Sequence, residues 1–421
     1  MEKKHILVVA DHPFSPSGVG SQTRYVIEAL IKTGEYRFTC IGGAIKHLDY
    51  EPQQHPVWGS DWVVYPVDGY GNPDMIRSLI RSERPMMLWF MTDPRFFGWL
   101  WEIEDEIRPL IPMVYYHVWD NYPYPDFNAP FYESNDMIAC ISKVTHDIVQ
   151  TLCPDVDSAY VPHAVPNDVF KKLDSSAVEE FRKSVIDSDD DEEEKMIFFW
   201  NNRNARRKQS GSIIFWFREF LDKVGHDKAM LLMHTDPKDE NGQDLEAILK
   251  GLDLINGEVR FSNQKVEPEH LALMYNAADC TINIADAEGF GLSTLESLSC
   301  ETPIIVNMTG GLQEQVTDGE EWFGIGIEPC SKAIIGSQNI PYIYEDRVSK
   351  DMFIEALVKM YEMPEKDRAA MGALGRQHVL KNYGFKLFET RWVDLIETVI
   401  EKHGSWETRK GYDTWEIKEV I

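Results

Sequence analysis

The sequence predicts an α/β protein of two domains, each a parallel sheet covered by helices on both faces. At 421 residues the chain is longer than a single hydrophobic core usually supports. Short apolar runs alternate with helix-compatible segments, which is typical of strands buried on both faces. This alternation runs through the first half and begins again in the second half, after a proline-containing linker.

In the first half, His5–Ala10 (HILVVA) is a compact apolar run that predicts a buried strand. A loop rich in Gly, Ser and Pro follows, and then a helical stretch from about Ser21 to Lys32. Further strands are expected at Met86–Met91, Pro112–His117 and Asp136–Ser142.

In the second half, strands are expected at Met196–Trp200, Ala229–His234, Val259–Ser262, Cys280–Ala285 and Pro303–Asn307. The linker Val161–Phe170 contains two prolines and marks the domain boundary. We therefore predict two Rossmann-like domains, at residues 1–165 and 166–380, and C-terminal helices at 381–421. The tail from about Pro364 to His403 is helical in pattern.

The composition fits a packed globular enzyme and disfavours broad attachment to nucleic acid or anionic membrane. The chain is 43% hydrophobic and has a formal net charge of −28. No uninterrupted apolar stretch is long enough to span a bilayer, and the first apolar run is too short for a signal peptide. The six cysteines form no C-x-x-C pair, so we expect reduced thiols and a cytoplasmic protein.

The acidic run Asp187–Glu194 (DSDDDEEE) could suggest a metal site. A run of like charges is usually a solvated loop, and this run lacks the glycine of a calcium-binding loop. We interpret it as a surface loop.

The stretch Ala285–Glu301 (ADAEGFGLSTLESLSCE) is the most informative part of the sequence. Glu288 should lie in the loop that leaves a strand, and glycines then turn the chain into a helix that bears Glu296. A helix that starts at glycine presents backbone N–H groups and the positive dipole end to a phosphate. Glu296 could then reach ribose hydroxyls, whereas Glu288 faces whatever lies beyond the phosphates. An ordinary glycine loop with two solvated glutamates is the alternative.

The segment Asn201–Gly211 (NNRNARRKQSG) also follows a predicted strand. Arg203 and Lys208 are suited to neutralise a diphosphate leaving group, because a guanidinium and an ammonium together match its charge. A basic cluster on the surface is the alternative, although a concentrated basic loop is notable in so acidic a chain.

Three further segments are weaker candidates for the site. Gly310 and Gly311 follow a strand and allow a ligand to approach the backbone, although a plain turn is equally compatible. Gly18 and Gly20, in the loop after the first strand, could supply amides to the donor or to the cleft. His117 ends a strand beside a loop rich in Tyr and Trp, where a purely structural histidine is as probable as a functional one.

These segments together resemble the retaining glycosyltransferases of family 4, which have the GT-B architecture of two Rossmann-like domains facing each other across a cleft. The resemblance rests on the E-x7-E signature (Glu288 and Glu296) and on a basic pair five residues apart (Arg203 and Lys208). TGGLQE, the N-terminal glycine loop and the ending GALGRQHVLKNYGF add to it. It covers nearly the whole chain and is stronger in the second half.

The resemblance implies a retaining, metal-independent transfer of a hexose-type sugar from a nucleotide diphosphate sugar, with a UDP-sugar favoured. It implies that Glu296 binds the ribose, that Glu288 lies near the sugar hydroxyls, and that Arg203 and Lys208 stabilise the departing diphosphate. His117 would reach the sugar from the other domain. A donor phosphate oxygen would help to take the proton of the acceptor. The implied contacts to the donor are Gly18, Gly20, Gly289, Phe290, Gly291, Leu292, Ser293, Gly310 and Gly311.

The sequence departs from the family at several positions. The family's glycine before the arginine is Asn202 here, and the glycine that usually follows the lysine is Gln209. Residues Pro162–Val165 (PHAV) replace the common P-N-G-V, and Gln338–Arg347 lies in an insertion or divergent loop. These departures bear on the phosphate contacts and the donor more than on the fold.

The acceptor is open. A glycan or a small molecule is favoured, and a modified DNA base is less favoured because the chain is so acidic. The aromatic residues of the first half could form a stacking platform, although core packing explains most of them. Two other readings are a non-catalytic nucleotide-sugar binder and a relative with other chemistry, such as a sugar-nucleotide epimerase or a phosphorylase. The sequence leaves the oligomeric state undetermined.

Overall fold

The computed structural model describes residues 3–121, 124–186, 195–338 and 340–413, and the chain forms two compact units. Unit 1 comprises Met1–His163, Gly336–Pro341 and Lys386–Ile421, and unit 2 comprises Ala164–Ile335 and Tyr342–Phe385. The sequence predicted boundaries at 165 and 380, whereas Gly336–Pro341, inside the predicted second domain, belongs to unit 1. The acidic run Asp187–Glu194 lies outside the described residues.

The described residues of unit 1 include an eight-stranded sheet of order β3-β4-β2-β1-β5-β6-β7-β8. Neighbouring strands are parallel except β3 and β4, which are antiparallel. The strands are β1 (Lys4–Asp11), β2 (Tyr36–Gly43), β3 (Gln53–His55), β4 (Gly59–Pro66), β5 (Met87–Met91), β6 (Met113–His117), β7 (Met137–Cys140) and β8 (Ser158–Tyr160). The helices between them are α1 (Gly18–Ile31), α2 (Pro73–Glu83), α3 (Gly98–Trp101), α4 (Glu104–Ile107), α5 (Ala129–Glu133) and α6 (Lys143–Leu152), with 3-10 turns at Pro94–Phe96 and Asp126–Asn128.

The central strands of unit 1 are those whose sequences are continuously apolar. Every residue of β5, β6 and β7 is buried, as expected for strands covered on both faces. The strands predicted near residues 5, 87, 113 and 137 are present. The edge strands β3 and β8 contain only three residues each, and their sequences give no alternating or apolar signal.

The last helix, α15 (Phe385–His403), packs within unit 1. The ring of Trp392 lies 5.8 Å from that of Trp89 on β5 and 4.8 Å from that of Tyr116 on β6. Beyond this helix and the 3-10 turn Trp406–Thr408, Arg409 donates to Asp136 at 2.6 Å. The C-terminal segment is thus joined to unit 1 by aromatic packing and by a buried ion pair.

Unit 2 contains a six-stranded parallel sheet of order β11-β10-β9-β12-β13-β14. Its strands are β9 (Met196–Asn201), β10 (Ala229–His234), β11 (Val259–Ser262), β12 (Cys280–Asn283), β13 (Ile304–Asn307) and β14 (Gly324–Ile327). Its helices are α7 (Ser175–Ile186), α8 (Ser210–Val224), α9 (Leu245–Leu252), α10 (Pro268–Ala277), α11 (Leu292–Ser299), α12 (Leu312–Val316), α13 (Lys350–Glu362) and α14 (Glu365–Asn382), with a 3-10 turn at Arg206–Lys208. The five strands predicted here are all present.

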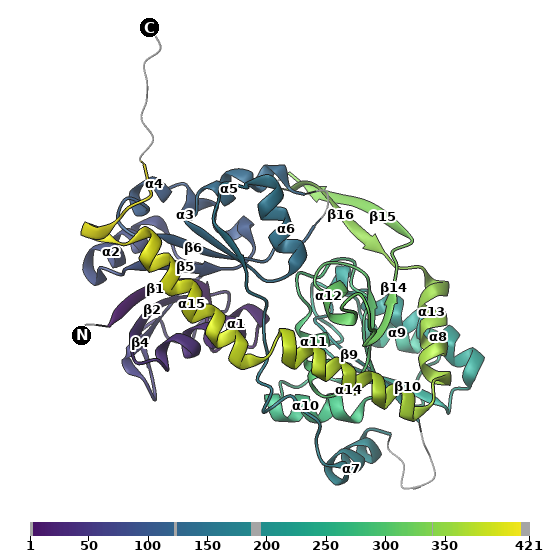
Figure 1. The fold of residues 1–421 in the computed structure, drawn as a ribbon. Helices are drawn as coiled ribbons and strands as arrows, with labels where there is room; N and C mark the ends of the chain where they lie inside the picture. Colours follow the sequence, from purple (N-terminus) through teal and green to yellow (C-terminus); the bar gives the residue numbers. More distant parts are fainter. Residues whose placement is uncertain (1–2, 122–123, 187–194, 339, 414–421) are drawn as a thin grey trace. The chain divides into compact units, whose positions relative to one another are not determined.

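The core of unit 2 forms where the apolar strands meet helices with one apolar face. Phe217 and Phe220 of α8 are fully buried and pack on Phe198 of β9. Helix α13 lies beside α8 (Figure 1), and its Phe353 contacts Trp216 with ring centroids 5.7 Å apart. None of the described helices is long and apolar enough to cross a membrane.

A two-stranded hairpin of β15 (Ser331–Ser337) and β16 (Ile340–Arg347) follows β14. The sequence predicted only an insertion or divergent loop over residues 338–347. The strand β16 ends with the charged residues Glu345, Asp346 and Arg347.

Candidate active site

Three neighbouring strands of unit 2 each end in an asparagine: Asn201 on β9, Asn283 on β12 and Asn307 on β13. The strands are parallel, so their carboxyl ends meet at one edge of the sheet, where ligands bind in open α/β folds. Each asparagine amide donates to a neighbouring loop or helix. Asn307 donates to the carbonyl of Ala285 at 2.8 Å and so fixes the start of the Glu288 loop.

The loop Glu288–Gly291 is held by the segment that follows β13. The backbone N–H of Gly311 donates to the carbonyl of Glu288 at 3.0 Å, and the Gln315 amide donates to the carbonyl of Phe290 at 2.7 Å. A Cβ atom at Gly311 would lie 2.6 Å from the Cα of Phe290, so only glycine permits this approach. Gly310 has a positive φ of 48°. The two glycine segments predicted to contribute to the site are therefore in contact.

Helix α11 begins directly after this loop. Gly291 is its N-cap residue with a φ of 93°, a conformation that favours glycine. Among the described residues, no side chain caps α11, so the amides of its first turn, which includes Leu292 and Ser293, are placed to bind an anion. The sequence interpretation of this segment as a loop leading into a helix N-terminus matches the structure.

Lys208 and Glu288 form an ion pair that joins the loop after β9 to the loop after β12. Both side chains are largely shielded from water, with 9% and 13% exposure. Burial opposes the charge of Glu288, but the charges of Lys208 and Arg207 and hydrogen bonds from Lys208 and Asn283 hold its pKa below the usual range. The site therefore holds a shielded ion pair beside the N-terminus of α11.

Arg203, the other member of the predicted basic pair, is bound elsewhere. Its guanidinium forms a bidentate ion pair with Asp239, at 2.6 and 3.1 Å, and its side chain is 62% exposed. Hydrogen bonding to Arg203, against a smaller effect of burial, lowers the pKa of Asp239 to about 2. A role of Arg203 at the diphosphate therefore requires that it leave Asp239, and the role stays a prediction.

Glu296, one turn into α11, is half-buried and accepts a 2.7 Å hydrogen bond from the hydroxyl of Tyr275. The amide of Asn201 donates to the same hydroxyl at 2.8 Å. Burial raises the pKa of Glu296 to about 7, although the hydrogen bond from Tyr275 acts against this. Neither Tyr275 nor Asn201 was predicted as a site residue, because these contacts join β9, α10 and α11 and no sequence motif spans the three elements.

Of the site residues predicted in unit 1, His117 and Gly20 are buried and Gly18 is exposed. His117 ends β6 with no exposed surface, and its Nε2 lies 2.9 Å from the Tyr132 hydroxyl. Burial lowers the pKa of His117 to about 3, so this imidazole is neutral. Gly18 begins α1, and the N–H of Gly20 donates to Ser17, the N-cap residue. Contact of these residues with a donor stays a prediction.

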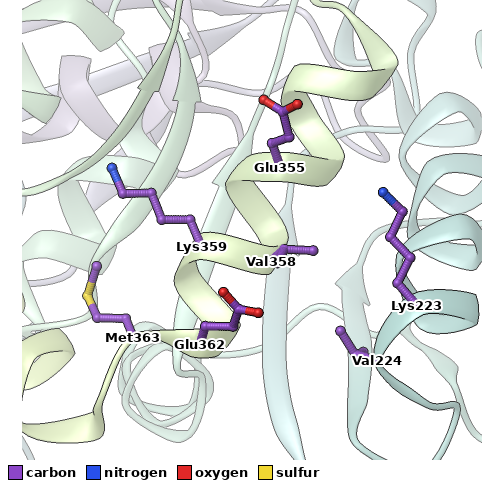
Figure 2. Close-up of a pocket in the computed structure, with 7 residues that line it drawn as sticks. All are labelled: Lys223, Val224, Glu355, Val358, Lys359, Glu362 and Met363. Carbon is purple, nitrogen blue, oxygen red and sulfur yellow. The ribbon is translucent and has the colours of Figure 1, made fainter.

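A groove between α8 and α13 does not belong to this group of residues. Figure 2 shows Lys223 and Val224 of α8 on one side and Glu355, Lys359 and Glu362 of α13 on the other. The ammonium groups of the two lysines do not converge, and none of the lining residues contributes to the loops described above. At the sheet edge, in contrast, Lys208 pairs with Glu288 and Tyr275 donates to Glu296.

The chain resembles known proteins in sequence and in fold. Residues 240–377 match the family model described as Glycosyl transferases group 1. This segment, about a third of the chain, is therefore similar to the group 1 glycosyl transferases. The match includes the Glu288 loop, α11 and the TGGLQE segment but starts after Lys208.

Curated glycosyltransferases resemble the chain over short segments. A D-inositol 3-phosphate glycosyltransferase of Acidothermus cellulolyticus is 45% identical over 53 residues, which is 13% of this chain and 12% of the relative. A GDP-mannose-dependent monoacylated alpha-(1-6)-phosphatidylinositol monomannoside mannosyltransferase of Corynebacterium glutamicum is 26% identical over 113 residues, 27% of this chain and 24% of the relative. The matches thus span at most about a quarter of these relatives.

Solved structures resemble the chain over nearly its whole length. Sucrose-phosphate synthase of Thermosynechococcus elongatus superimposes with a TM-score of 0.75 at 14% identity, covering 95% of this chain and 100% of that one. The Anabaena protein HepE, solved with UDP and glucose, gives 0.69 at 11% identity, covering 94% and 100%. At these identities the likeness concerns the fold, and the GT-B fold predicted from the sequence is confirmed.

Proposed function

We propose that the chain is a retaining glycosyltransferase that moves a hexose-type sugar from a UDP-sugar to a hydroxyl of a glycan or small molecule. The ion pair of Lys208 and Glu288 beside the N-terminus of α11 is the observation on which this rests. It combines a shielded cation with an anion-binding helix end, as a departing diphosphate requires.

In the proposed reaction the bond between the sugar C1 and the diphosphate oxygen breaks, and a bond forms between C1 and the acceptor oxygen. The acceptor proton passes to a donor phosphate oxygen. Lys208 and the first amides of α11 stabilise the charge on the leaving diphosphate. Because these groups supply the positive potential, we expect no requirement for a bound metal. Retention of the anomeric configuration is proposed from the resemblance to family 4.

Glu296 is placed to accept hydrogen bonds from the ribose hydroxyls of the donor. Its carboxylate is oriented by Tyr275 at 2.7 Å, so little side-chain freedom is lost on binding. Glu288 can orient the sugar while it holds Lys208. These roles follow the E-x7-E resemblance, with Glu288 in the loop before α11 and Glu296 one turn into the helix.

The preference for UDP is supported by the structural likeness to HepE, which was solved with UDP and glucose. The name of the Corynebacterium relative specifies GDP-mannose, so GDP-sugars are the main competing donors. For the acceptor we favour a glycan or small molecule over a modified DNA base. All six cysteines are free, which supports the proposal that the protein works in the cytoplasm.

Calorimetric titration with UDP, GDP and ADP, followed by product analysis with the matching sugar nucleotides, tests the proposal. A transferase releases nucleotide and forms an α-linked product from an α-linked donor. A binder shows affinity without turnover, and an epimerase changes the donor without any acceptor. Either of the last two results would contradict the proposed function.

A further inference from the structure

Gln209 adopts a backbone conformation that favours glycine. Its φ is 60° and its ψ is 26°, the left-handed region, in the turn directly after Lys208. A glycine would adopt this conformation without a steric cost. The steric cost of glutamine at this position therefore points to a structural role for its side chain.

The Gln209 side chain bridges two elements. Its amide nitrogen donates to the Asp286 carboxylate at 2.7 Å, and its amide oxygen accepts from the Ser212 hydroxyl at 2.7 Å. Asp286 lies two residues before Glu288. The bridge thus connects the turn that bears Lys208 to the loop that bears Glu288.

Asp286 is buried, with 1% exposure, and is also bound by the hairpin. Its carboxylate forms an ion pair with Arg347 at the end of β16. Its backbone N–H donates to the carbonyl of Arg207 at 2.8 Å, and its own carbonyl accepts from the N–H of Asp346 at 2.9 Å. Removing one partner of such a buried charge leaves the other uncompensated.

Glu345, with 2% exposure, completes the connection. It accepts a bidentate pair from Arg206, at 2.5 and 2.7 Å, and a 2.9 Å bond from Arg347. The turn Arg206–Lys208 is therefore joined to β16 as well as to the Glu288 loop. Arg206 and Arg347 therefore form the ion pairs that join this turn to the hairpin.

We propose that Gln209, Asp286 and Arg347 are positioning residues that hold Lys208 in place against Glu288, and that the β15–β16 hairpin supports the donor site through them. The inference rests on the proposed function for its catalytic meaning. A misplacement of about 1 Å in a catalytic group can lower the rate by about 100-fold. The side-chain bridge therefore matters for turnover even where it matters little for folding.

The variant Gln209→Gly separates positioning from stability. Glycine relieves the left-handed conformation but removes the bridge, so Tm should stay unchanged or rise while kcat falls at least tenfold. Arg347→Ala should lower kcat as well, and Arg347→Lys should restore part of it. Lys350→Ala is the matched control, because it removes the exposed ion pair with Glu219 in the same unit and should leave kcat unchanged.

Labelling of Lys208 by an acylating reagent, followed by mass spectrometry, provides a readout that does not need turnover. In the full-length protein, Lys208 should react several-fold faster in Gln209→Gly and Arg347→Ala than in the wild type or Lys350→Ala. Unchanged labelling and unchanged kcat in Gln209→Gly would overturn the proposal. If the wild type turns over no donor but labelling changes as expected, the bridge stands and the proposed function fails.

Discussion

The hydroxyl of Tyr275 donates a 2.7 Å hydrogen bond to the carboxylate of Glu296, across the interface between α10 and α11. Asn201, at the end of β9, donates to the same hydroxyl at 2.8 Å. The orientation of Glu296 is thus set by one strand end and one neighbouring helix. If Glu296 binds the ribose of the donor, Tyr275 acts on nucleotide affinity without touching the nucleotide.

Tyr275→Phe should weaken UDP binding about three- to tenfold, because it removes the hydrogen bond that orients Glu296 and leaves the Asn201 amide without this acceptor. Isothermal titration with UDP measures the change. Tyr115→Phe is the control, since it removes a buried hydroxyl that donates to the Thr92 carbonyl in unit 1. Equal losses in both variants would indicate a general loss of stability rather than a role at the nucleotide.

Glu296→Gln should change how stability depends on pH. The pKa of Glu296 is raised to about 7 by burial, so between about pH 4.5 and 7 the folded state holds a proton that the unfolded state has released. Wild-type stability should therefore fall as pH rises through this range. The glutamine variant lacks this loss, so it should gain up to about 3 kcal/mol relative to the wild type by pH 8. Chemical denaturation at pH 5 and at pH 8 measures the free energy of unfolding of both proteins. An equal difference between variant and wild type at the two pH values would contradict the raised pKa.

Arg203 should contribute to turnover only if it exchanges Asp239 for the donor diphosphate. Arg203→Ala would then lower kcat at least tenfold, whereas Asp239→Asn, which frees the guanidinium, would leave kcat unchanged or raise it. Steady-state kinetics of both variants with the preferred donor tests this expectation. Full activity in Arg203→Ala would restrict the role of Arg203 to the surface ion pair.

Removal of divalent metals should leave turnover unchanged, because Lys208 and the amides of α11 are proposed to supply the positive potential at the diphosphate. Nucleotide release measured with EDTA and with added Mg²⁺ tests this expectation. A strict dependence on Mg²⁺ would show that the residues of the site do not suffice to stabilise the leaving group.

The framework of the site could be predicted from the sequence. Continuous apolar runs such as MIFFW located the central strands, because strands buried on both faces have few polar residues. The glycines at 289, 291, 310 and 311 indicated close backbone approaches, and the structure places Gly311 against Phe290. Gly289 and Gly291 also indicated the turn into helix α11.

The partners of the charged residues could not be predicted. Arg203 binds Asp239 and Tyr275 binds Glu296 across different loops and helices, and no periodicity in the sequence encodes such contacts. Likewise, the hairpin β15–β16 falls in a region predicted only as an insertion, and its link to Asp286 depends on the folded arrangement. The departure of Gln209 from glycine was visible in the sequence, but its bridge to Asp286 was not.

Nucleotide release from UDP-, GDP- and ADP-sugars without added acceptor, by the wild type and Lys208→Ala, tests the central proposal most directly. The wild type should slowly release UDP from one UDP-sugar, and Lys208→Ala, still folded by circular dichroism, should lose this activity by about 100-fold or more. Failure of the wild type to bind or cleave any donor would contradict the proposed function. Equal release by Lys208→Ala would contradict the assignment of the site.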